Sequence, residues 1–110
     1  MPESLKLTAF QRVQLEGLLN QQRGSVSNLM ITYDIIEKIK LPKEQSEPNI
    51  KTIPDGRIMI DKNGLAVIPE ETFDLEKAEK RKLLEIINGY EGFGPSDIEW
   101  LIPLRKQLAD

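Results

Sequence analysis

The stretch Thr8-Ala9-Phe10-Gln11-Arg12-Val13-Gln14-Leu15-Glu16-Gly17-Leu18-Leu19 decides how this chain begins to fold. Thr8 and Gln11 have the spacing of a capping box, in which each side chain accepts a hydrogen bond from the other residue's backbone N–H. Placed at about 100° per residue, the apolar residues spread over more than half of the helical cylinder. We therefore predict a helix that begins after Thr8, packs on more than one neighbour, and ends near Gly24, a suitable left-handed residue after the helix.

A second apolar segment follows directly. Ser25 or Ser27 is suited to cap it, and Pro42 ends it. Its apolar residues cover a broad arc of the helix: Leu29, Ile31, Tyr33, Ile35, Ile36 and Ile39. This pattern predicts the most buried helix of the chain. Because about four residues separate the two helices, we expect them to form an antiparallel hairpin.

The middle of the chain has a different character. Residues 42–49 are polar, carry two prolines and are expected to form a mobile surface loop. Three short segments rich in β-branched residues follow, at Ile50–Ile53, Arg57–Ile60 and Leu65–Ile68. Because Asn63-Gly64 is the stronger hairpin signal, we expect the second and third segments to pair. The first segment would add a third strand, and all of them should lie on the helices, since two strands alone are marginal.

Two helices are predicted in the last third of the chain. The first runs from Leu75 to about Asn88, with Asp74 or Thr72 as its cap and Gly89 at its end.

The second predicted helix follows the connector Gly92-Phe93-Gly94-Pro95 and has Ser96 and Glu99 as a capping box. Pro103 lacks an N–H and clashes with the carbonyl of Glu99, so we expect a kink there, or a new helix that starts at Pro103. The fold class that follows is α+β, mainly α: a helical hairpin, a small β-hairpin or three-strand meander, and two C-terminal helices.

The amino-acid composition excludes more classes of function than any sequence motif does. The chain has 110 residues, a length that most simply forms one domain, residues 1–110. It contains neither His nor Cys, which excludes zinc sites built on them, Cys-His and Ser-His catalysis, and disulfide bonds. The net charge of -3 has the wrong sign for a generic nucleic-acid binder.

We also expect a cytoplasmic location. Cysteine is absent, which fits a reducing compartment. The segment Met1–Lys6 has no positively charged region ahead of an apolar core, so no secretory signal is expected. Apolar runs of about four residues are far too short to span a membrane.

None of the candidate motifs for a cofactor or a metal has the residues and spacing that binding requires. Acidic residues near positions 70–74 and 97–99 lie at predicted helix starts, where they complement the helix dipole. The segment Asp61-Lys62-Asn63-Gly64 faintly resembles a calcium loop, but Thr72 stands where the bidentate Glu belongs. Gly89, Gly92 and Gly94 have neither the order nor the preceding strand of a dinucleotide fingerprint. No cofactor, metal or catalytic residue is therefore predicted.

Two sets of residues are candidates for binding. Tyr90, Phe93 and Trp100 cluster around the glycine-rich connector, where they serve as packing residues or as anchors for a protein partner. The basic run Lys77, Lys80, Arg81 and Lys82 would contact phosphates if the helices and hairpin formed a winged-helix-like DNA-binding body. Interleaved glutamates favour a solvated helix face instead.

The segments Leu7–Leu19, Ile31–Ile39 and Asp97–Leu104 together resemble small uncharacterised proteins of bacteriophages and prophages. The resemblance rests on apolar spacing, transfers no site residues, and implies a bacterial cytoplasm and a role in assembly or host interference. Our leading hypothesis is a non-catalytic protein–protein interaction module that associates with itself, because the two wide apolar arcs exceed what a small core covers. A DNA-binding protein is the alternative, and an unrecognised carboxylate or lysine enzyme is the third.

Overall fold

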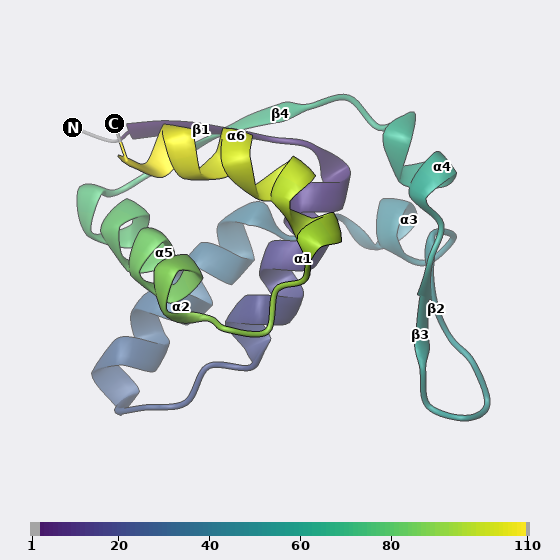
Figure 1. The fold of residues 1–110 in the computed structure, drawn as a ribbon, viewed down its shortest axis with the longest axis horizontal. Helices are drawn as coiled ribbons and strands as arrows, with labels where there is room; N and C mark the ends of the chain where they lie inside the picture. Colours follow the sequence, from purple (N-terminus) through teal and green to yellow (C-terminus); the bar gives the residue numbers. More distant parts are fainter. Residues whose placement is uncertain (1–2, 110) are drawn as a thin grey trace.

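Helices dominate the chain and two small antiparallel sheets complete it, as the predicted α+β class requires (Figure 1). The computed structural model describes residues 3–109. The elements in chain order are β1 (Glu3–Leu7), α1 (Ala9–Asn20), α2 (Val26–Ile39), α3 (Lys43–Ser46), β2 (Ile50–Thr52), β3 (Ile58–Ile60), α4 (Lys62–Ala66), β4 (Glu71–Leu75), α5 (Lys77–Gly89), the 3₁₀ turn η1 (Pro95–Asp97) and α6 (Ile98–Ala109). None of the described helices has the length and apolar character needed to cross a membrane.

The N-terminal helical hairpin forms as predicted. The Thr8 hydroxyl accepts from the N–H of Gln11 at 3.1 Å, and the Gln11 side chain accepts from the N–H of Thr8 at 2.9 Å, which confirms the capping box. Ser25, rather than Ser27, caps α2. The end of α1 differs from the prediction: Gln21 is its C-terminal cap, so Gly24 lies in the connector beyond it.

The sheet formed by β1 and β4 was not predicted. Alternating residues of the two strands, Leu5, Leu7 and Leu75, are fully buried, so the sheet turns one face to the core. Leu75 therefore points inward from a strand and not from a helix. Consequently α5 begins at Lys77, and its N-cap is Glu76, whose N–H donates to the Glu79 side chain at 2.8 Å, and not the predicted Asp74 or Thr72.

The predicted pairing of residues 57–60 with residues 65–68 is wrong, whereas the segment at 50–53, expected as a third strand, does pair with 57–60. β2 pairs with β3 around the turn Pro54-Asp55-Gly56, where Gly56 has a φ of 91° that favours glycine. The Asp61 side chain accepts from the N–H of Gly64 at 3.0 Å and so caps α4, which places Asn63-Gly64 in a helix. Residues 65–68 are then no strand, and the expected loop at 42–49 contains α3.

The β2–β3 hairpin, which we call the arm, projects from the helical body (Figure 1). Our expectation that these strands lie on the helices is therefore also wrong. Ile58 and Met59, neighbours that point to opposite faces of the arm, are 66% and 60% exposed. The arm gains little apolar burial from the rest of the chain.

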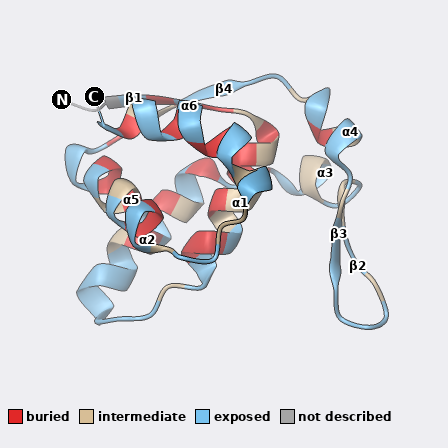
Figure 2. Ribbon diagram, viewed as in Figure 1, coloured by how far each residue is buried: buried red, intermediate tan, exposed pale blue. Residues whose placement is uncertain are grey.

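The main core lies between the β1–β4 sheet and helices α1, α2, α5 and α6 (Figure 2). α6 covers the outer edge of β1, where the Gln107 carboxamide donates to the Lys6 carbonyl at 2.8 Å and accepts from the Lys6 N–H at 2.7 Å. A side chain thus replaces the strand that would otherwise pair with this edge.

The C-terminal helix follows the predicted connector, but its start differs in detail. The Gly94 N–H donates to Asp97 at 2.8 Å, so Gly94 and Asp97 cap η1 in place of the predicted pair Ser96 and Glu99. α6 runs without interruption through Pro103, so the alternative of a new helix at that residue is wrong. A kink at Pro103 stays a prediction.

Candidate functional site

The predicted aromatic residues lie together at the junction of α5, η1 and α6. The ring centroids are 4.6 Å apart for Tyr90 and Phe93 and 5.8 Å apart for Phe93 and Trp100. Phe10 of α1 extends the row, with its ring 6.5 Å from that of Trp100. Sequence reasoning missed Phe10 because nothing local connects it to residues some ninety positions later.

This aromatic row packs the helices against one another. Trp100 is only 8% exposed, and its indole N–H donates to Asp97 at 3.0 Å. The Tyr90 ring lies against Gly92 so closely that a Cβ at that position would overlap it, which explains the glycine. Tyr90 and Phe93 keep partly exposed surface. Their role as partner anchors stays a prediction.

A groove of about 510 Å³ lies beside the row, between β1, α1, α4 and α6. Its polar groups are largely engaged: the Gln11 amide donates to the Trp100 carbonyl at 3.0 Å, and Lys62 lies 5.2 Å from the centre of the Phe10 ring. Lys6 and Glu70 form an exposed ion pair at 3.9 Å. Among residues 3–109, no group of three or more His, Cys, Asp or Glu side chains is placed to hold a metal ion.

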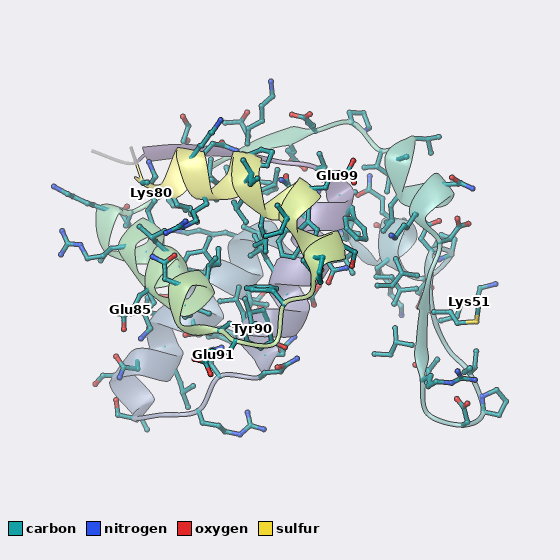
Figure 3. The ribbon with its side chains drawn as sticks, in the orientation of Figure 1. Lys51, Lys80, Glu85, Tyr90, Glu91 and Glu99 are labelled. Carbon is teal, nitrogen blue, oxygen red and sulfur yellow. The ribbon has the colours of Figure 1, made fainter. Side chains whose placement is uncertain are left out.

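The predicted phosphate-contacting residues do not form one surface. Lys80, labelled in Figure 3, is 7% exposed and makes an interaction of its own. Lys82 is half-buried, 3.8 Å from Glu85 on the next turn. Lys77 and Arg81 are exposed. These two share a helical face with Leu84 and Asn88, because the spacings are four, seven and eleven residues. Nucleic-acid binding stays a prediction.

The most unusual surface is the outer face of α2. Four apolar residues at successive helical turns are exposed, and we call them the α2 stripe: Val26 (75%), Leu29 (37%), Met30 (62%) and Tyr33 (61%). The prediction that α2 is the most buried helix is therefore wrong, since only Thr32, Ile35 and Ile39 are buried. The sequence signal was present, because an arc this broad has more apolar surface than one neighbour covers.

Polar groups border the α2 stripe at its C-terminal end. Glu37 is one turn beyond Tyr33 and 2.8 Å from Lys40. Hydrogen bonds from Lys40 and from the Tyr33 hydroxyl lower the pKa of Glu37, and the same bond to Glu37 raises the pKa of Tyr33. Tyr33 itself is 61% exposed, so the apolar surface of its ring remains open.

Comparison with known proteins adds no relative. No family model matches the chain, and it matches neither a curated protein nor a solved structure.

Proposed function

We propose that this chain is a non-catalytic protein–protein interaction module that associates with a second copy of itself through the α2 stripe. The observation that carries the proposal is the exposure of four apolar side chains at positions i, i+3, i+4 and i+7 of one helix. Single exposed apolar residues are ordinary on protein surfaces, but a contiguous stripe is typical of a surface that another protein covers.

Charge favours an antiparallel pairing of the two helices. The first turn of α2 carries no acidic side chain, whereas Asp34 and Glu37 lie at the other end of the stripe. A parallel pair would set Glu37 beside Glu37 of the second copy. An antiparallel pair separates the two Glu37 side chains and brings each to the N-terminal end of the partner's α2, the positive end of the helix dipole.

The expected affinity is moderate. Burying the eight stripe residues of a pair contributes about 1–2 kcal/mol each, since they are only partly exposed at the start. Association opposes this with about 4–15 kcal/mol of lost freedom. With a cost near the lower end of that range, because the stripe lies on a helix that is already ordered, the net is roughly 5–8 kcal/mol, a dissociation constant of about 1–100 µM.

Sedimentation equilibrium tests the proposal. The wild-type chain should approach twice its monomer mass of 12.6 kDa as concentration rises through this range. Met30→Glu should stay monomeric, because a buried unpaired carboxylate opposes pairing. Val67→Glu is the matched control: Val67 is 80% exposed but lies outside the stripe, so this variant should associate like the wild type. A monomeric wild type at millimolar concentration would overturn the proposal.

The relative orientation of the two α2 helices can be tested by disulfide crosslinking. The chain has no cysteine, so introduced cysteines are the only thiols. Antiparallel pairing centred between Leu29 and Met30 sets Val26 against the partner's Tyr33. A mixture of the single variants Val26→Cys and Tyr33→Cys should form a mixed disulfide under mild oxidation, and neither variant should crosslink alone. Crosslinking of Val26→Cys with itself would show that the helices pair in parallel.

The resemblance to small bacteriophage and prophage proteins suggests where such self-association would be used. On that basis we propose a role in phage assembly or in interaction with the host. Such a role requires binding and no chemistry.

A further inference from the structure

A second apolar surface lies between α5 and α6. Two depressions of about 340 and 330 Å³ meet where both are lined by Asn88, Ile102 and Arg105. Ile98 and Ile102, one turn apart on α6, are each 49% exposed, and Leu84 and Phe93 are half-buried in the floor. We call this surface the α5–α6 groove.

One end of the groove is basic. The Arg105 Nε donates to the Asn88 side chain at 3.0 Å, which holds the guanidinium across the groove and leaves its terminal nitrogens available. Lys106 lines the same depression, and Lys77 and Arg81 share the α5 face that carries Leu84. Within residues 3–109, none of these four cations forms an ion pair.

This basic cluster stands out in a chain whose overall net charge is -3. Its pattern, apolar at one end and basic at the other, is the complement of an amphipathic helix that carries acidic residues beyond its apolar face. The geometry points to the α5–α6 groove as a docking site for an acidic amphipathic helix of another protein. This site is separate from the α2 stripe and does not depend on self-association.

A helix fits these observations better than the other anionic partners. Nucleic acid would satisfy the cations but has no aliphatic side chains to cover Ile98 and Ile102. A helix laid in the groove places residues i, i+3, i+4 and i+7 on the apolar floor and its carboxylates on the basic end. Arg105 is pre-oriented for a bidentate carboxylate contact because Asn88 already fixes its Nε.

Peptide selection tests the inference without a named partner. A display library of helical peptides of about four turns, randomised on one face, is selected on the wild-type chain with Ile102→Glu as the counter-selection. Enriched peptides should share leucine or isoleucine at helical spacing, followed by aspartate or glutamate. Ile102 is half-exposed, so its replacement should leave the fold intact, which far-ultraviolet circular dichroism checks.

The best peptide is then measured by fluorescence anisotropy. The double variant Arg105→Glu and Lys106→Glu should weaken it at least about tenfold, because it replaces attraction by repulsion. Lys51→Glu is the matched control, since Lys51 is an exposed lysine on the projecting arm (Figure 3) and should change binding less than about twofold. The same peptide with lysine in place of every glutamate should prefer the double variant.

Several results would overturn the inference. Selection that returns basic peptides or no common pattern is one, and binding that survives both groove variants is another. A third is binding of phosphatidylserine vesicles or a DNA duplex through Arg105 and Lys106 while no peptide binds. Finally, the double variant should sediment like the wild type. If it loses self-association instead, a second copy occupies the groove.

Discussion

Replacing Arg12 by methionine should destabilise the fold by about 3 kcal/mol. Arg12 of α1 is 3% exposed, and its guanidinium donates to the Ile39 carbonyl at 2.7 Å, the Lys40 carbonyl at 2.9 Å and Glu71 at 3.1 Å. It also lies 4.8 Å from the centre of the Phe73 ring. One side chain therefore joins α1 to the C-terminal end of α2 and to β4.

The magnitude follows from what each partner loses. The Ile39 carbonyl would be left buried without a donor, at a cost of about 2 kcal/mol, and the more exposed Lys40 carbonyl costs about 1 kcal/mol because water reaches it. Glu71 is 61% exposed and recovers hydration, so the ion pair contributes less than about 1 kcal/mol. Burial also lowers the pKa of Arg12, because burying its charge costs free energy. An uncharged methionine avoids this cost, which offsets part of the loss.

Urea denaturation followed by Trp100 fluorescence measures the effect, because the single tryptophan is buried in the native state. Arg23→Met is the matched control: among the residues that the structure describes, its guanidinium binds only the neighbouring carbonyls of Gln21 and Gln22, so it should change stability by less than about 0.5 kcal/mol. Glu71→Gln should cost less than about 1 kcal/mol. A loss below about 1 kcal/mol in Arg12→Met would refute the claim that carbonyl capping dominates.

Three further predictions concern single positions. Gly17→Ala should stabilise α1 by about 0.5–1 kcal/mol in urea, since an added Cβ meets no atom within 4 Å; a destabilised variant would contradict this. Hydrogen bonds from the Gly94 N–H and then the Trp100 indole lower the pKa of Asp97 below 3.8. The ionised Asp97 carboxylate therefore stabilises the folded state above about pH 4, and this contribution is lost as the pH falls through the lowered pKa. The Trp100 indole proton should report this titration by NMR, and Asp97→Asn should abolish it. Gln107→Ala should cost about 1–2 kcal/mol and speed exchange of the Lys6 amide; unchanged exchange would count against edge capping.

Helix starts were predictable where the signal is local. Thr8 with Gln11 and the cap at Ser25 need only residues three positions away, so composition and spacing suffice. Asn63-Gly64 shows the limit of the same reasoning. The dipeptide suits a hairpin turn, but here the Asp61 side chain accepts a hydrogen bond from the Gly64 N–H and caps a short helix instead.

The β1–β4 sheet was harder, although its strands carry a readable alternation at Leu5 and Leu7 and at Phe73 and Leu75. Each strand alone is too short to be distinguished from a helix end or a coil. Their pairing joins residues some seventy positions apart, and no local rule predicts such a partner.

The candidate surfaces divide in the same way. The aromatic grouping of Tyr90, Phe93 and Trp100 was predictable from proximity along the chain. Two of the four stripe residues, Leu29 and Tyr33, belonged to the predicted apolar arc of α2, and only the packed structure decided which part of that arc the core covers. The α5–α6 groove needed the antiparallel arrangement of two helices before Leu84 and Ile102 could meet.

The amino-acid sequence by itself determined the four longer helices α1, α2, α5 and α6, the caps of the first two, the absence of histidine and cysteine chemistry and the mainly helical class. These properties depend on side chains within one or two turns of each other. Tertiary structure alone decided which strands pair, that Arg12 reaches the end of α2, and which apolar faces stay exposed. Those outcomes depend on contacts between distant segments, whose free energy comes from surface buried when the whole chain packs.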